Sequence, residues 1–379
     1  MQPKAARNIS IEALRLIAVA GIAIFHTFQW AFQAICAGAP ECAPLAAFPY
    51  SGLLGFINLL GCWANEVFFM ISGYFLIPSA ARAWSDGATW KSQLQRTKQR
   101  LGKVIMPTAF YCLVALTWST AVSSIPDVSL HAHYWYTLGL EFIWVYAATA
   151  SMAPLFGLTK NRLDKKSYTA AIVAVGFLVF VVNGYLAAQS SLYNGDFSWL
   201  QKIMSAVTYV VAFLMGGLLR DYTESTDPHK ARTVAKRSLA AVLIIAIGLV
   251  VALSATSNLS AMAALSYKST SIISFALAAT SLFFAATREN KSNHQRTANV
   301  IVTLSAATLG FYIMQSLTSS LWRPIFNSAL ANILASASSP ATTCIVNGTV
   351  ISIVFALALL IIDAARSFIA RCFKQRSTH

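Results

Sequence analysis

Charged residues are scarce in this sequence: they make up 11% of its 379 residues, whereas hydrophobic residues make up 57%. The mean hydropathy of +0.61 is too high for a domain with an ordinary polar surface. No long polar linker, tandem repeat or low-complexity segment separates the apolar stretches. These absences exclude an ordinary soluble domain and a repeat array, and they predict a single membrane domain over residues 1–379.

Cysteine is also sparse, with six residues and no C-x-x-C pair. No Cys or His spacing matches a zinc site, and His131 and His133, which are two residues apart, are interpreted as interface residues. We therefore predict no metal site. Only Cys36 and Cys42 lie close together in a loop, and they are candidates for a disulfide if that loop faces an oxidising compartment.

Most of the sequence consists of long apolar runs. A bilayer core of about 30 Å needs about 20 helical residues, and windowed apolarity separates ten such runs. The sequence therefore predicts an all-α fold, a polytopic membrane protein with about ten transmembrane helices. The predicted spans are residues 9–34, 52–77, 102–124, 134–157, 168–188, 200–219, 238–257, 266–287, 299–321 and 346–369.

Acidic residues are few compared with basic ones: 13 Asp and Glu against 28 Lys and Arg give a net charge of +15. If the basic residues formed a patch on the surface of a soluble fold, such a charge would indicate a nucleic-acid partner. However, 24 of the 28 basic residues lie before the first span, in every second connection, or at the chain end. Since Lys and Arg accumulate in cytoplasmic loops, we predict a cell-membrane protein with both termini cytoplasmic and no nucleic-acid partner.

The first predicted span carries three ionisable residues, Glu12, Arg15 and His26. A charged side chain at the centre of a membrane helix costs roughly 2.5 to 3.5 kcal/mol, so these residues indicate a function. At about 100° per residue they share one face, and His26 lies about 16 Å along the axis from Arg15. The pair is thus expected near the cytoplasmic surface and His26 toward the outer surface. The alternative is that all three only hold neighbouring helices together.

Further polar residues stand at the end of the second span and the start of the third. Glu66 is another carboxylate inside a span, and Ser72-Gly73 is a small pair that lets a backbone or a ligand approach closely. Arg100 and Lys103 are three residues apart and project together at the membrane surface, where they can hold phosphates. The alternative for these two is a membrane anchor of the kind that every basic loop provides.

Three short motifs stand in the first 110 residues: Glu12-x-x-Arg15 with His26 eleven residues later, Phe68-Phe69-x-x-Ser72-Gly73-Tyr74, and Arg100-x-x-Lys103 followed by Pro107. Together with the ten predicted spans, these three motifs resemble those of the acyltransferase 3 family. These membrane enzymes move acyl groups, most often acetyl, from a cytoplasmic coenzyme A thioester to a carbohydrate or another acceptor, often across the membrane. The resemblance is strong over residues 7–110 and weaker beyond.

The resemblance implies the residues of the catalytic site. The catalytic histidine of the family corresponds to His26 and its partner arginine to Arg15, with Glu12 at the acidic position. Arg15 is expected to hold the donor or to fix the first span through Glu12. Glu66 falls at a position that is frequently acidic and is expected to orient His26. Gln315 stands where a late helix of the family commonly has histidine.

The resemblance also implies how the substrates are held. Arg100 and Lys103 fall on the family's Arg-x-x-Arg and are expected to bind the donor phosphates, although a lysine cannot make the bidentate fork of an arginine. Ser72 is expected to offer a hydroxyl near the acyl group. Trp135 and Tyr136 are either stacking surfaces for a sugar ring or part of an aromatic belt at the membrane interface.

The implied activity is that of a membrane O-acetyltransferase, in the class that transfers acyl groups other than amino-acyl groups. Acetyl-CoA is then the donor substrate and no cofactor is bound permanently, while the acceptor is a hydroxyl of a surface or exported carbohydrate or glycolipid. His26 acts as general base or forms a transient acyl-imidazole, and the sequence leaves both open. The alternatives are a proton-coupled transporter or flippase, for which no inverted repeat is found, and a scaffold for a partner enzyme.

Overall fold

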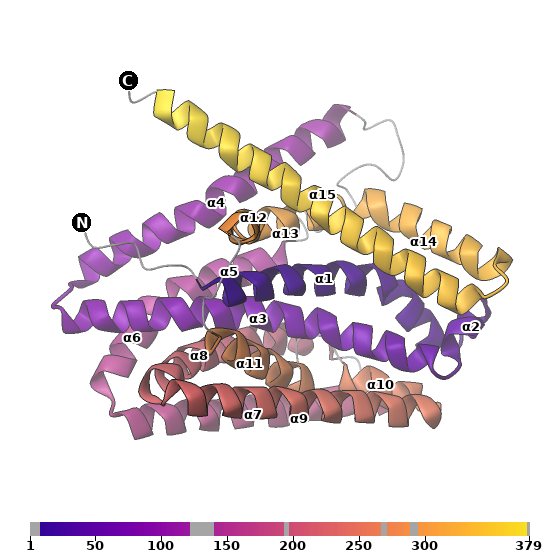
Figure 1. The fold of residues 1–379 in the computed structure, drawn as a ribbon, viewed down its shortest axis with the longest axis horizontal. Helices are drawn as coiled ribbons and strands as arrows, with labels where there is room; N and C mark the ends of the chain where they lie inside the picture. The colour runs from indigo at the N-terminus through magenta and orange to yellow at the C-terminus, as the bar shows by residue number, and fades with distance from the viewer. Residues whose placement is uncertain (1–7, 122–139, 193–196, 267–270, 289–294, 377–379) are drawn as a thin grey trace.

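The computed structural model describes residues 8–121, 140–192, 197–266, 271–288 and 295–376 (Figure 1). These residues form helices and no strand, which agrees with the all-α prediction. In chain order they are α1 Ile9–Cys36, the 3-10 turn η1 Pro40–Cys42, α2 Ala43–Ala46, α3 Tyr50–Ser85, α4 Trp90–Ala121, α5 Glu141–Ser151, α6 Ala153–Arg162, α7 Lys165–Leu192, α8 Ser198–Ser225, α9 Pro228–Ala255, α10 Leu259–Leu265, α11 Ile272–Ala286, α12 Gln295–Ser305, α13 Thr308–Leu317, α14 Ser319–Ser336 and α15 Pro340–Arg376.

Each of the ten predicted spans corresponds to one or two of these helices, but not all are long enough to cross a membrane. Within the described residues, eight segments are long and apolar enough to cross a membrane, and α5 and α6 together count as one of them. The helices α12 and α13 make a ninth only as a pair bent by 42°. The tenth, α11, has 15 residues, which is short of the roughly 20 that a bilayer requires. The chain is therefore a multi-pass membrane protein with eight or nine spans in its described part.

Local sequence signals fix where several helices begin. The side chain of Asn8 accepts hydrogen bonds from the backbone N–H groups of Ser10 and Ile11, which caps α1. Asp227 caps α9 in the same way, with Pro228 at its first position. As a result α9 begins ten residues before the predicted span 238–257 and continues out of the apolar stretch into the basic segment.

The helix α14 was not predicted. The predicted spans 299–321 and 346–369 leave residues 322–345 as a connection between them, yet Ser319–Ser336 is helical. Its buried residues Leu330 and Leu334 pack into a cluster with Leu45 and Leu54. Tertiary packing therefore stabilises a helix whose weakly apolar sequence did not indicate one.

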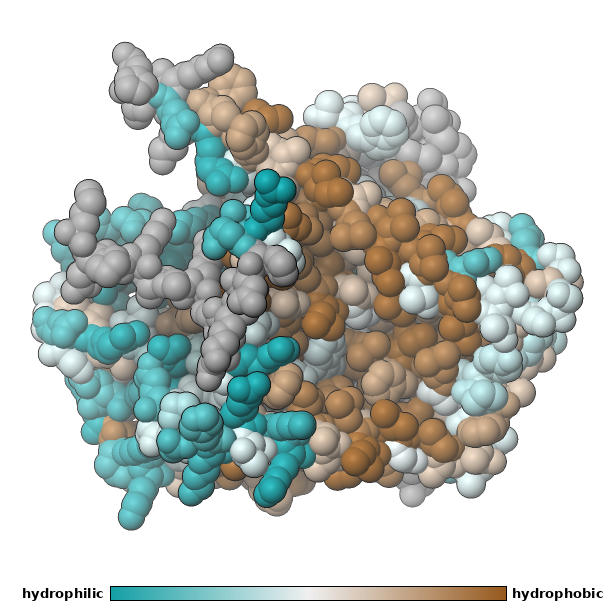
Figure 2. All heavy atoms as spheres, in the orientation of Figure 1, coloured by the Kyte–Doolittle hydropathy of each residue, from teal (hydrophilic) through white to brown (hydrophobic). Residues whose placement is uncertain are grey.

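The two ends of the bundle differ in polarity. The helix α1 begins and α15 ends at the same end (Figure 1), and hydrophilic side chains gather there beside a wide hydrophobic band (Figure 2). We call this the basic end, because the connections α3–α4, α6–α7 and α8–α9 with their Lys and Arg residues lie there. The common end agrees with an even number of crossings, while its assignment to the cytoplasm stays a prediction from the charge pattern.

The helix α3 is the centre of the bundle and packs against α1, α6, α8, α9 and α11. Two glycines allow its closest contact. A Cβ atom on Gly73 would lie 1.7 Å from the carbonyl oxygen of Phe213, and one on Gly216 would lie 1.9 Å from that of Met70. The backbones of α3 and α8 therefore touch directly, as expected for small residues between membrane helices.

We expect Gly73→Ala to disrupt this contact, because the added methyl group would meet backbone atoms that cannot move without separating α3 from α8. The expected loss is about 3 kcal/mol of folding free energy, the upper end of the range for overpacking. Thermal unfolding of the detergent-purified protein, followed by size-exclusion chromatography, measures it. Gly248→Ala on α9 is the matched control, since a Cβ there meets nothing within 4 Å. Equal stability of the two variants would contradict the direct contact.

Candidate functional site

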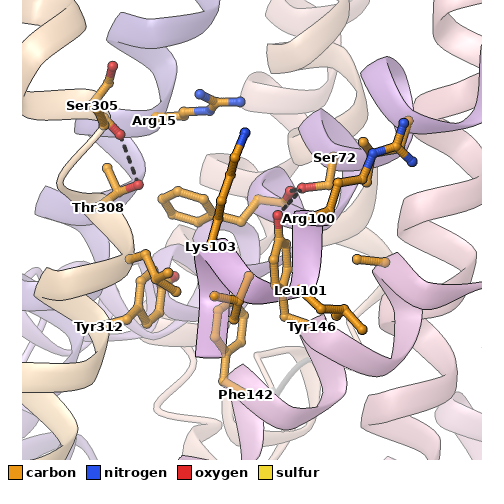
Figure 3. A pocket seen from close by; sticks show the side chains of 16 residues that line it. Arg15, Ser72, Arg100, Leu101, Lys103, Phe142, Tyr146, Ser305, Thr308 and Tyr312 are labelled. Atoms are coloured by element: carbon orange, nitrogen blue, oxygen red, sulfur yellow. Dashed lines mark hydrogen bonds between the residues drawn. The ribbon is translucent and has the colours of Figure 1, made fainter. Parts of the chain in front are cut away.

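A cavity of about 400 Å³ opens between α1, α3, α4, α5 and the break between α12 and α13 (Figure 3). It brings together four of the predicted site residues from three separate helices, Arg15, Ser72, Arg100 and Lys103. In Figure 3 the cationic side chains lie on the upper side of the cavity and the rings of Phe142 and Tyr312 on the lower side. The cavity is thus basic at one side and aromatic at the other.

The three cations of the cavity differ in how they are paired. Arg15 Nη1 donates to Glu12 Oε2 at 2.8 Å, so part of its charge is neutralised within α1. Arg100 Nη1 is buried with no hydrogen-bond partner, and Lys103 is exposed. The beginning of α13, at Thr308, borders the same space, and a helix N-terminus favours an anion. These groups make the basic side suited to a phosphate-bearing ligand.

The aromatic side of the cavity is held rigidly. The rings of Phe142 and Tyr312 stack with centroids 4.5 Å apart, and Tyr312 Oη donates to Asn65 Oδ1 at 2.9 Å. Ser72 Oγ lies 3.0 Å from Tyr146 Oη and donates to it. Since the faces of these rings are apolar, and both tyrosine hydroxyls already have hydrogen-bond partners within the protein, this side favours an uncharged chain over further phosphates.

His26 does not line this cavity. Its Nδ1 lies 3.0 Å from Gln315 Oε1 on α13, and because an amide oxygen can only accept, the hydrogen is on Nδ1. That tautomer leaves the lone pair on Nε2, the atom that can take up a proton. Neighbouring residues fix this part of α1: Ser352 donates to Thr27 Oγ1 at 2.9 Å, and Phe28 packs against Gly348.

The helix α13 connects the cavity to His26. Tyr312 lines the cavity and Gln315, three residues later, holds the imidazole. Residues three apart are neighbours on one helix face, so the aromatic side of the cavity lies about one turn from the partner of His26. Arg15 and His26 are on the same unbroken helix α1, about 16 Å apart along its axis.

Glu66 does not take the place that was expected for it. The hydrogen-bond partner of His26 is Gln315, whereas Glu66 is fully buried and lies beside Ser274 of α11. The reason is the antiparallel register of α1 and α3. Gly21 faces Trp63, which places Glu66 several residues nearer the basic end than His26.

The expected disulfide is not formed. Cys36 and Cys42 are both free. The helix α1 continues to Cys36, whose Sγ is exposed and lies 3.9 Å from the carbonyl oxygen of Leu259, while η1 carries Cys42 into the interior with no exposed surface. Burial raises the pKa of the Cys42 thiol to about 11. In the structure one thiol is therefore exposed, the other is buried, and the two are unpaired.

The sequence interpretation missed several residues of the cavity. Phe142 and Tyr146 line the cavity but have no motif of their own. Asn65, which accepts from the lining residue Tyr312, was not singled out either, and only Gln315, at the family's histidine position, gave a signal on α13. Trp135 and Tyr136, predicted to contact the sugar, lie outside the described residues, as do His131 and His133.

One comparison with known proteins identifies a family. A family model described as an acyltransferase domain matches residues 8–362, which include the whole cavity, His26 and Gln315. No curated protein and no solved structure matches the chain.

Without any reductant, we expect the native protein to react with a maleimide at one more thiol than its Cys36→Ser variant does, because Cys36 is free and exposed. Intact mass spectrometry counts the attached groups. Cys42→Ser is the matched control and should not change the native count, since that thiol is buried and the maleimide cannot reach it. A requirement for reductant before Cys36 reacts would show that the disulfide forms after all.

Proposed function

The chain belongs to the acyltransferase 3 family and is a membrane acyltransferase, and we propose that it transfers an acetyl group from cytoplasmic acetyl-CoA to a hydroxyl of a surface or exported carbohydrate. One observation carries the proposal. A single cavity has a buried guanidinium nitrogen without a partner, Arg100 Nη1, at its basic side, and its aromatic side lies one helical turn from the residue that holds His26.

The basic side suits the nucleotide end of the donor. Coenzyme A carries several negative charges on its phosphates, and a buried guanidinium nitrogen without a partner, Arg100 Nη1, is stabilised by a phosphate oxygen. Lys103 and Arg15 add positive charge beside it. This interpretation favours a role in binding for Arg100 and Lys103 over the simpler one of a membrane anchor.

The remainder of the donor is neutral and flexible. Its pantetheine arm can extend from the phosphates along Phe142 and Tyr312 toward His26, so the acetyl thioester is carried away from the basic end. An arm that extends in this direction would connect phosphates bound at the basic end with a catalytic histidine about 16 Å farther along α1.

His26 then acts as the general base. Its Nε2 takes the proton of the acceptor hydroxyl while the hydroxyl oxygen attacks the carbonyl carbon of the acetyl group. The tetrahedral intermediate collapses, the carbon–sulfur bond breaks, and the proton passes from His26 to the departing thiolate of coenzyme A. Gln315 keeps the hydrogen on Nδ1 throughout, because its Oε1 accepts from that atom. A transient acyl-imidazole on Nε2 uses the same geometry.

Removal of the base should stop the reaction but leave donor binding intact. We expect His26→Ala to lower acetyl-CoA turnover by about 10²- to 10⁴-fold, the usual contribution of a general base, with an unchanged Kd for coenzyme A. Turnover by the purified protein in lipid and binding by calorimetry measure the two effects. His229→Ala, a change at an exposed histidine of α9, is the control. Normal turnover of His26→Ala would overturn the mechanism.

Donor binding should depend on the buried guanidinium. We expect Arg100→Gln to raise the Kd for coenzyme A about tenfold, the equivalent of one charge-assisted hydrogen bond. Lys98→Gln is the control, because Lys98 is exposed on the same helix and does not line the cavity. An equal loss in both variants would indicate general attraction to the basic end, and no coenzyme A binding by the wild type would favour a transporter.

A further inference from the structure

The surroundings of His26 contain hydrogen-bond donors that have no acceptor in the described part of the chain. Gln315 is 2% exposed; its Oε1 accepts from His26, and its Nε2 has no partner. Arg323 Nε and Trp30 Nε1 are likewise buried without a partner. A buried polar group without a partner costs about 1 to 3 kcal/mol, so three such donors indicate that acceptor atoms belong there.

These donors lie around the same histidine. Trp30 is four residues after His26 on α1, so the two are neighbours on one helix face. Arg323 on α14 is within electrostatic reach of the imidazole. The residue before it, Trp322, donates from Nε1 to the carbonyl oxygen of Gln315 at 3.0 Å, which ties the start of α14 to the partner of His26.

The charge of Arg323 is also uncompensated. Its guanidinium lies over the ring of Trp322, 5.5 Å from the centroid, and no acidic side chain among the described residues pairs with it. Other arginines of the bundle do have carboxylate partners: Arg15 with Glu12, Arg220 with Glu224, and Arg366 with Asp363. An arginine stays charged, and a half-buried cation in a membrane protein is costly unless an anion accompanies it.

The position of Arg323 in the bundle indicates that its anion is not part of the donor. The helix α14 follows α13 and lies toward the end opposite the basic end (Figure 1), whereas the cations suited to the coenzyme line the other cavity. The phosphates of the donor therefore have their own site, and the anion at Arg323 must come from another molecule.

We propose that Arg323 and the free amide of Gln315 bind a carboxylate or phosphate group of the acceptor, next to the hydroxyl that His26 deprotonates. The inference rests on the proposed function and names its acceptor class: an anionic carbohydrate rather than a neutral one. A guanidinium matches two oxygens of such a group, and Gln315 Nε2 donates to one of them. Binding there holds the acceptor beside the base, so the charge selects and orients the substrate.

Binding of charged and neutral sugar probes tests the proposal. D-glucuronate, D-glucose 1-phosphate and methyl D-glucoside are titrated by calorimetry into the purified protein in a maltoside detergent, which holds no phosphate. We expect the wild type to bind the two anionic probes about tenfold more tightly than the neutral one. Arg323→Gln should lose this preference, and Arg323→Lys should keep part of it. Arg232→Gln, at an exposed arginine of α9, should leave it unchanged.

Three results would overturn the proposal. They are a wild type without preference for the anionic probes, an equal loss for all three probes in Arg323→Gln, and displacement of the sugar acids by anionic lipid in nanodiscs, which would make a lipid headgroup the occupant. Coenzyme A binding, measured on the same samples, confirms that Arg323→Gln is folded. It also separates the two ideas, because normal donor binding with no anion preference leaves the acyltransferase mechanism standing.

Discussion

The structure depends on one constraint: ionisable groups inside an apolar bundle need partners, and water is not there to supply them. The helix α1 shows how this is met. Arg15 is paired with Glu12 one turn away, while His26 is held by Gln315 from a helix that is almost 300 residues later in the chain. The same constraint joins Tyr111, Asp363 and Arg366 between α4 and α15.

The break between α12 and α13 takes part in this arrangement. The two helices meet at a bend of 42°. Ser305 and Thr308, one on each side of the bend, line the cavity, and Gln315 farther along α13 contacts His26. The bent pair thus forms part of both halves of the site. Its neighbour α3, fixed to α8 by direct backbone contact at Gly73 and Gly216, supplies the rigid side against which the cavity opens.

The proposed site has two regions of positive charge with different tasks. The region near Arg100 is suited to the phosphates of the donor, and the region near Arg323 to an anion on the acceptor. In the proposed mechanism, an acetyl group that arrives from one side meets, at His26, a hydroxyl that is held from the other side. This division would let one enzyme use a cytoplasmic donor for an acceptor that never enters the cytoplasm.

The sequence by itself determined the membrane class, the position of almost every span and the polar residues Arg15, Ser72, Arg100 and Lys103 that line the cavity, because apolar length, charge placement and short motifs are local properties. It also predicted that Arg15 and His26 share one helix. Only the tertiary structure decided which side chains meet. The register of α1 against α3 separates Glu66 from His26, η1 turns Cys42 away from Cys36, and the fold of α13 and α14 brings Gln315 and Arg323 to the histidine. Such contacts depend on packing between segments far apart in the chain, and no local pattern encodes them.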